Sequence, residues 1–131
     1  MLFRSRTATP EQRPAPLPYL ALDEPWGLDI ELEVVWNGEV VSRPPYASMY
    51  WSPAQMLAHL TVNGAATRTG DLFASGTVSG PGRDQVGSLI ERGGDFLADG
   101  DEVVLRATAP GAHGTTIGFG EAAGRIKEAR T

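Results

Sequence analysis

Apolar and polar side chains alternate most regularly over residues 28–36. Apolar residues occupy the even positions, and the odd positions hold the acidic residues Asp29, Glu31 and Glu33. This period of two is typical of a strand with one buried and one solvated face. The next two residues, Asn37 and Gly38, favour a type I′ turn because both tolerate positive φ. We therefore predict a hairpin whose return strand covers residues 39–41.

Residues 52–62 carry the signals of one short helix. Ser52 suits the N-cap, Pro53 the first helical position, and Gln55 the third, where its side chain can close a capping box. Helical spacing puts three apolar residues on a buried stripe, namely Met56, Leu57 and Leu60. It also puts three polar residues on a second row, namely Gln55, His59 and Asn63. This row either borders a site or faces water, and for His59 we favour a structural role.

Five further stretches carry strand signals. They are residues 71–75, 88–92, 102–108, 115–119 and 122–126. In the second of these, Glu91 would share its face with Leu89, and burial of that face would raise the pKa of the Glu91 carboxyl. The chain contains 16 Gly and 10 Pro, which favour many short elements over long helices. We therefore predict a mainly β fold with one short helix near residues 52–62.

A glycine-rich loop over residues 76–82 follows the first of these stretches. Its glycines would let the backbone approach a ligand closely, and Thr77 offers a hydroxyl that both donates and accepts hydrogen bonds. The alternative is a turn that only requires positive φ. Residue spacing by itself favours neither interpretation.

The acidic row on the first predicted strand also has two interpretations. Carboxylates at positions i and i+2 on one strand face can share a hard cation such as Mg²⁺ or Ca²⁺. A half-exposed antiparallel strand requires a polar face in any case. We favour the solvated face.

Size and composition exclude several classes of protein. The 131 residues suit one domain. A net charge of −5 with only 11 Lys and Arg argues against a nucleic-acid surface or a basic membrane helix. The chain has no Cys, and its sequence shows neither a membrane span nor the apolar core of a signal peptide. We therefore expect a cytoplasmic protein without disulfides or thiolate metal sites.

Several motifs stand in order along the chain. They include Trp26-Gly27-Leu28-Asp29, Ser52-Pro53-Ala54-Gln55, Gly70-Asp71-Leu72-Phe73-Ala74-Ser75-Gly76-Thr77 and Gly118-Phe119-Gly120-Glu121. Together they closely resemble the carboxy-terminal third of the fumarylacetoacetase family, within the fumarylacetoacetate hydrolase superfamily. The likeness runs from about residue 10 to residue 126.

The resemblance implies a homodimeric, metal-dependent hydrolase of tyrosine and phenylalanine breakdown. Such an enzyme cleaves a carbon–carbon bond of 4-fumarylacetoacetate to give fumarate and acetoacetate. The implied fold is a mixed β-sandwich roll. The implied chemistry uses Mg²⁺ or Ca²⁺ held by carboxylates, together with a His-Glu pair that activates water.

Two functional residues of the family match residues of this chain. Thr77 matches the substrate-contacting threonine, and Glu91 matches the glutamate that supports the catalytic histidine. The family's catalytic histidine and metal-binding carboxylates have no match, so we expect no complete metal site here. The family also continues beyond its glutamate with a strand and a hairpin that this chain lacks, and this deletion removes lateral support from Glu91.

The same comparison of motifs divides the chain in two. Residues 7–18 carry four prolines and Met1 to Ser5 match nothing in the family, so we interpret residues 1–18 as a non-native or extended arm. Residues 19–131 correspond to the carboxy-terminal part of a catalytic domain. We expect a fragment that is inactive alone. The alternatives are a non-catalytic β module or dimerising subunit, and a hydrolase of a related diketo acid of the acylpyruvate type.

Overall fold

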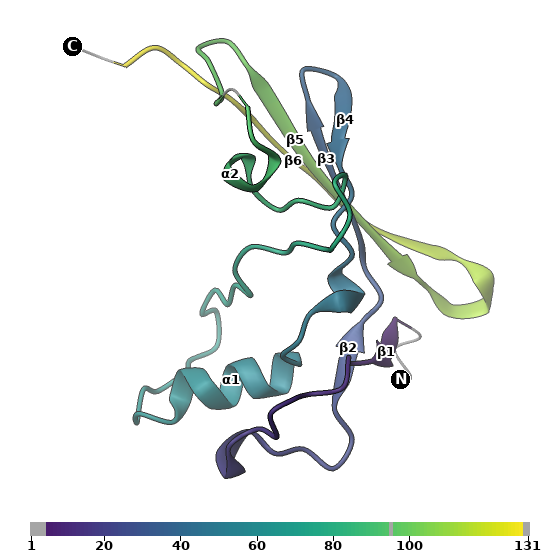
Figure 1. The fold of residues 1–131 in the computed structure, drawn as a ribbon, viewed down its shortest axis with the longest axis vertical. Helices are drawn as coiled ribbons and strands as arrows, with labels where there is room; N and C mark the ends of the chain where they lie inside the picture. Colours follow the sequence, from purple (N-terminus) through teal and green to yellow (C-terminus); the bar gives the residue numbers. More distant parts are fainter. Residues whose placement is uncertain (1–4, 95, 130–131) are drawn as a thin grey trace.

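The computed structural model describes residues 5–94 and 96–129, and its fold is mainly β (Figure 1). A small antiparallel sheet joins β1 (Arg6–Ala8) to β2 (Trp26–Leu28). A larger antiparallel sheet has the order β4-β3-β5-β6. Its strands are β3 (Glu31–Trp36), β4 (Glu39–Ser42), β5 (Glu102–Pro110) and β6 (Thr116–Arg125). The mainly β class predicted from the sequence is confirmed.

The predicted hairpin forms between β3 and β4. Asn37 and Gly38 adopt φ values of 49° and 84°, as a type I′ turn requires. The Asn37 side chain also reaches the next turn of the sheet, because its Nδ2 donates to Asp101 Oδ1 over 2.7 Å. Hydrogen bonds from the Ala98 N–H and from Asn37 lower the pKa of the Asp101 carboxyl. This side-chain link fixes the two turns relative to each other.

The single strand predicted over residues 28–36 is broken in two. The chain leaves the small sheet after Leu28 and enters the large sheet at Glu31. The buried residue of β3 is Val35, which is 5% exposed and lies on the face that the alternation assigned to solvent. The predicted face assignment is therefore wrong at this end of the strand. Sequence alternation marks which residues share a face, but only the surrounding chain decides which face is covered.

The longest helix among the described residues, α1 (Pro53–Thr61), lies where the sequence predicts it. The Ser52 Oγ accepts from the Gln55 N–H over 3.2 Å, and the Gln55 Oε1 accepts from the Ser52 N–H over 3.0 Å. This reciprocal pair is the capping box, which satisfies two backbone donors at the start of the helix. The short helices are η1 (Pro18–Leu20), η2 (Tyr46–Ser48), α2 (Leu89–Arg92) and η3 (Ala112–Gly114).

The buried face of α1 differs from the prediction. Gln55 is only 1% exposed, whereas Leu57 of the predicted apolar stripe is 48% exposed. Gln55 and Gln12 exchange two amide hydrogen bonds of 2.8 and 2.9 Å. The Gln55 Nε2 also donates to the Leu20 carbonyl over 2.8 Å. The amino-terminal arm thus packs on α1 through polar contacts of Gln55, the member of the polar row that is buried, whereas His59 and Asn63 are exposed.

The amino-terminal arm is only partly extended. Arg6–Ala8 form β1, and residues 18–20 form η1, while the residues between these elements have no regular secondary structure. Residues 1–4 of the segment that we interpreted as non-native lie outside the described residues. The arm therefore belongs structurally to the body of the molecule from β1 onward.

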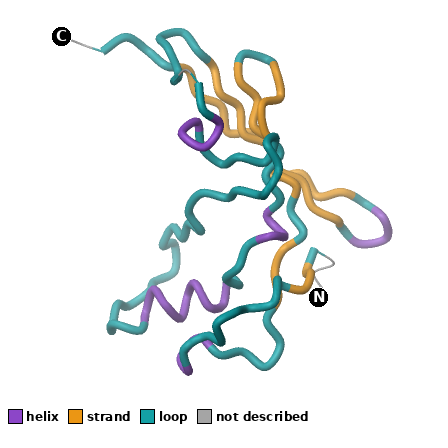
Figure 2. Tube along the Cα trace, in the orientation of Figure 1, coloured by secondary structure: helices purple, strands orange, loops and turns teal. Residues whose placement is uncertain are grey.

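Three strand predictions in the second half of the chain are corrected, those for residues 71–75, 115–119 and 122–126. Residues 71–75 contain no strand, and the whole stretch from 62 to 88 is drawn as loop in Figure 2. No described strand pairs with this stretch, and a strand without a partner does not persist in water. The two closing strands are instead one strand, β6, which passes through a register shift opposite Arg106 and Thr108. Gly120, with φ 79°, permits this irregularity.

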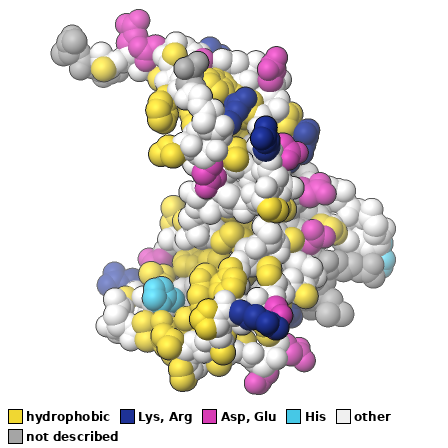
Figure 3. All heavy atoms as spheres, in the orientation of Figure 1, with side chains coloured by type: hydrophobic (Ala, Val, Ile, Leu, Met, Phe, Trp, Pro, Cys, Tyr) yellow, Lys and Arg dark blue, Asp and Glu magenta, His cyan; other side chains and the backbone are white. Residues whose placement is uncertain are grey.

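The core of the described chain is small. Its buried hydrophobic residues are Leu20, Val35, Val78 and Ala109. Every residue of the edge strand β6 is exposed. Hydrophobic side chains gather on the surface over α1 and the arm in Figure 3, where Leu57, Leu60 and Val62 are exposed. None of the helices among the described residues has the length and apolar composition of a membrane span.

Candidate functional site

The segment that carries Glu91 is a helix and not the predicted strand. Ser88 caps α2, and its Oγ accepts from the Glu91 N–H over 3.4 Å. Gly93, with φ 68°, ends the helix after one turn. Residues 89–92 alternate as a strand would, but they form a helix. The Ser88 N-cap and the Gly93 C-cap satisfy backbone groups that a strand without a partner would leave open.

The Glu91 carboxylate is held by two donors. Its Oε2 accepts from the Ser79 hydroxyl over 2.7 Å and from the Gly87 N–H over 2.9 Å. These bonds, Ser79 first, lower the pKa of the Glu91 carboxyl. The sequence had suggested the opposite shift, through burial beside Leu89. That suggestion is wrong, because Glu91 is exposed and its donors favour the charged form.

Thr77 lies where residues 77–79 approach residues 87–91, which we call the crossing at Gly87. A Cβ built on Gly87 would lie 2.5 Å from the Thr77 Cγ2 and 2.8 Å from the Ser79 Oγ, and it would also contact the Val78 carbonyl oxygen. Gly87 is thus a neighbour of both residues that the sequence singled out. Thr77 is exposed, and its hydroxyl has no hydrogen-bond partner among the residues that the structure describes. The site therefore offers a hydroxyl that can donate and a carboxylate that is charged at neutral pH.

The lowered pKa of Glu91 predicts an effect of pH. Because the folded chain favours the charged form, the stabilising contribution of Glu91 is present above its unfolded-state pKa and is lost as the pH falls through the folded-state pKa. We expect the ¹³C shift of the labelled Glu91 carboxyl to titrate with a midpoint below 4.5, the ordinary glutamate value. A midpoint at or above that value would contradict the hydrogen bonds described above.

Glu31 and Glu33 of β3 do not belong to a cluster of three or more metal donors among the described residues. No group of three or more His, Asp or Glu side chains within residues 5–94 and 96–129 is arranged to hold a metal ion. Glu33 is instead paired with two arginines, Arg43 over 2.9 Å and Arg106 over 3.4 Å. The described residues therefore do not by themselves provide a donor set that fits the Mg²⁺ or Ca²⁺ that the resemblance implies.

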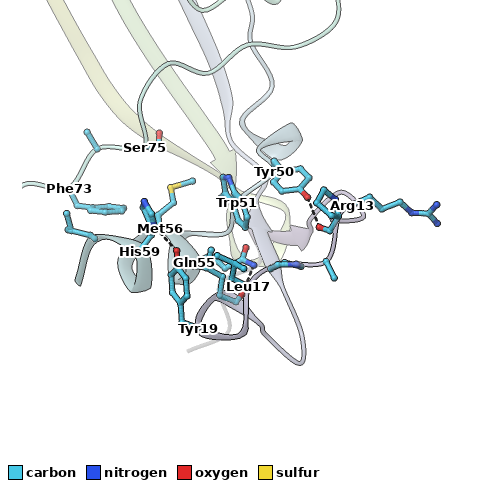
Figure 4. Close-up of a pocket in the computed structure, with 16 residues that line it drawn as sticks. Arg13, Leu17, Tyr19, Tyr50, Trp51, Gln55, Met56, His59, Phe73 and Ser75 are labelled. Carbon is cyan, nitrogen blue, oxygen red and sulfur yellow. Dashed lines mark hydrogen bonds between the residues drawn. The ribbon is translucent and has the colours of Figure 1, made fainter. Parts of the chain in front are cut away.

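A cavity of about 840 Å³ lies beside α1, and neither Thr77 nor Glu91 is among the residues that line it (Figure 4). Its walls come from the arm, from α1 and from residues 73–75. His59 lines it and is paired with Tyr19, whose Oη lies 3.0 Å from the His59 Nδ1. The two rings stack with their centroids 6.2 Å apart. This arrangement supports the structural role that we favour for His59, because its ring joins η1, at the end of the arm, to α1.

Sequence reasoning missed two residues of the site, Ser79 and Gly87. Ser79 belongs to the glycine-rich loop that drew attention to Thr77 and Gly87 lies five residues beyond that loop, but neither carries a chemical signal of its own in the sequence. Their role depends on the approach of residues 77–79 to residues 87–91, which only the fold brings about. The signal that the sequence offers for Ser79 is its position in the same loop, two residues after Thr77.

Comparisons with known proteins agree with this arrangement of motifs. The family described as "Fumarylacetoacetate (FAA) hydrolase C-terminal" matches residues 6–127. Fumarylacetoacetase of Homo sapiens is 41% identical over 137 residues, which cover 89% of this chain and 32% of that protein. Fumarylacetoacetase of Bos taurus is 40% identical, with 91% of this chain and 33% of that protein covered.

The relation extends to distant eukaryotes. Fumarylacetoacetase of Caenorhabditis elegans is 41% identical over 136 residues, which cover 89% of this chain and 32% of that protein. The chain thus spans about a third of the length of the curated relatives that it matches. Since the family match covers nearly the whole chain, the protein belongs to the fumarylacetoacetate hydrolase family.

Proposed function

We propose that this chain contributes one wall of an active site that hydrolyses 4-fumarylacetoacetate to fumarate and acetoacetate. The observation that carries the proposal is the crossing at Gly87, which keeps the Thr77 hydroxyl and the Glu91 carboxylate on adjoining segments. These are the two residues that match functional positions of the family. The cytoplasm and the breakdown of tyrosine and phenylalanine are parts of the same proposal.

The two side chains have separate roles in the proposed reaction. The Thr77 hydroxyl donates a hydrogen bond to an oxygen of the substrate and orients it. The Glu91 carboxylate accepts a hydrogen bond from the N–H of a histidine base that comes from outside the described residues. Its lowered pKa favours the charged form that this bond requires. This histidine takes a proton from water as the water oxygen adds to the substrate carbonyl, the adjacent carbon–carbon bond breaks, and the leaving carbon accepts that proton.

The chain alone should not carry out this reaction, because its described residues hold neither a histidine beside Glu91 nor a set of metal donors. We expect no loss of the absorbance of 4-fumarylacetoacetate when the chain is incubated with substrate and Mg²⁺ or Ca²⁺. Turnover above the uncatalysed rate would overturn this expectation. Buffer with metal and substrate, without the chain, provides the control.

Substitution of Thr77 tests the function in a complete enzyme. In a chimera that carries this chain in place of the matching third of a full-length relative, we expect turnover of 4-fumarylacetoacetate. Thr77→Ala should lower kcat/KM by about 100-fold, the lower end of what loss of one preorganised donor typically costs, while Thr77→Ser should retain most of the activity. A folded chimera whose kcat/KM is unaffected by Thr77→Ala would contradict the proposed role.

A second candidate function is that of a non-catalytic β module that pairs with another chain. It is favoured by β6, an edge strand that is exposed along its whole length and carries the exposed apolar residues Ile117 and Phe119. An open edge of this kind is a template for pairing with another strand. Size-exclusion chromatography with light scattering should then show a homodimer, and a monomer at every concentration would argue against this candidate.

A further inference from the structure

We propose that Ser79 is a positioning residue, which orients the Glu91 carboxylate for its partner in the reaction. This inference rests on the proposed function and adds a residue to it. Ser79 does not match a functional position in the motifs of the family that the sequence displays. Its role follows from the contacts between the two segments that cross at Gly87.

Three groups at the crossing form a closed set of hydrogen bonds. The Ser79 hydroxyl donates to the Glu91 Oε2 over 2.7 Å, and it accepts from the Gly87 N–H over 3.1 Å. The Gly87 N–H also lies 2.9 Å from the same Oε2. Glu91 therefore has one carboxylate oxygen fixed by two donors. Its other oxygen, Oε1, has no hydrogen-bond partner among residues 5–94 and 96–129, so it is free to accept from a further donor.

The loop that carries Ser79 is itself held in place. Its ends are joined by the Gly80 N–H, which donates to the Gln85 carbonyl over 2.7 Å. Its far side is attached to β4, because the Ser42 hydroxyl donates to the Val86 carbonyl over 2.6 Å. Val78, between Thr77 and Ser79, is one of the few buried hydrophobic residues. A buried anchor and several backbone bonds thus give Ser79 a defined position from which to orient Glu91.

Hydrogen bonds, and not charges, orient this carboxylate. Within the part of the chain that the structure describes, Glu91 has no ion pair. The adjacent Arg92 places its guanidinium over the Trp36 ring, 5.5 Å from the ring centroid. Among the described residues, no cation therefore draws the carboxylate away from the Ser79 hydroxyl. Loss of the Ser79 hydroxyl removes the shortest of the contacts that set this direction.

The test begins with the chain itself and requires no activity. In Ser79→Ala, we expect the midpoint of the ¹³C-detected Glu91 titration to rise toward the ordinary value, and amide exchange at Gly87 to become at least several-fold faster. Ser79→Thr keeps the hydroxyl and should restore both readouts. An unchanged Glu91 midpoint in folded Ser79→Ala would overturn the proposal. If Ser79→Ala does not fold, Ser79→Cys preserves the volume with a weaker donor and should give a smaller rise; no rise would again overturn it.

A second readout links the orientation to the reaction. In the chimera that tests the proposed function, Ser79→Ala should lower kcat by about 10-fold and leave KM within about two-fold, because an orienting contact of the base acts mainly after the substrate is bound. Ser79→Thr should recover most of kcat. A chimera that is inactive before substitution would count against the proposed function alone, since the titration of Glu91 is measured without substrate. An active chimera whose kcat is unaffected by Ser79→Ala would overturn the positioning role.

Discussion

The Gly87→Ala variant should lose about 3 kcal/mol of unfolding free energy, at the upper end of the cost of overpacking. The added methyl would contact the Val78 carbonyl oxygen and lie 2.5 Å from the Thr77 Cγ2. One of these neighbours is backbone and another is a β-branched side chain, so neither can move away without displacing the loop. Urea unfolding followed by circular dichroism measures the change.

The same variant should also disturb the site. Displacement of the crossing lengthens the bond between the Gly87 N–H and the Glu91 carboxylate, so the Glu91 pKa should move toward its ordinary value. Gly124→Ala is the matched control, because a Cβ at Gly124 in β6 meets nothing within 4 Å. We expect that control to change stability by less than about 0.5 kcal/mol. Equal effects of the two substitutions would show that the segments do not cross as closely as described.

The Gln55→Leu variant should lose about 3 kcal/mol of unfolding free energy. Gln55 is the most buried polar side chain apart from Ser52, and its amide serves the Ser52 N–H, the Leu20 carbonyl and Gln12. Leucine has a similar volume but no polar atoms, so the buried donor at Ser52 and the buried acceptor at Leu20 are left without partners. Thermal and urea unfolding of the variant and the parent chain give the difference.

A substitution on the same helix separates this effect from loss of apolar packing. Leu57→Ala removes a side chain that the helical pattern assigned to the core but that is half exposed in the structure. We expect it to cost only about 1 kcal/mol, well below a fully buried leucine. If Leu57→Ala were more damaging than Gln55→Leu, α1 would be packed by its apolar stripe, as the sequence predicts, and not by Gln55.

These two predictions concern different regions of the same molecule. Gln55 attaches the amino-terminal arm to α1, and this contact shapes the large cavity of Figure 4. Gly87 and Ser79 fix the two segments that bear Thr77 and Glu91. Because the two regions share none of these contacts, their effects on stability should be nearly additive in a double variant.

The sequence by itself determined the local features that short-range chemistry controls. The turn at Asn37 and Gly38 requires positive φ, and the capping box at Ser52 and Gln55 joins groups three residues apart, so both could be predicted without a fold. The mainly β class and the family also followed from motifs in the chain. Thr77 and Glu91 were singled out by that resemblance, and their proposed roles remain predictions.

Only the tertiary structure decided which faces are covered and which segments meet. The alternating pattern could not show that Val35 is buried, that Gln55 turns inward, or that residues 88–92 form a capped helix, because each outcome depends on contacts with distant residues. The direction of the pKa shift of Glu91 is decided by the fold for the same reason, since its main donor, Ser79, is 12 residues away. Periodicity is a local property, whereas burial and hydrogen-bond partners across the chain are set by the fold.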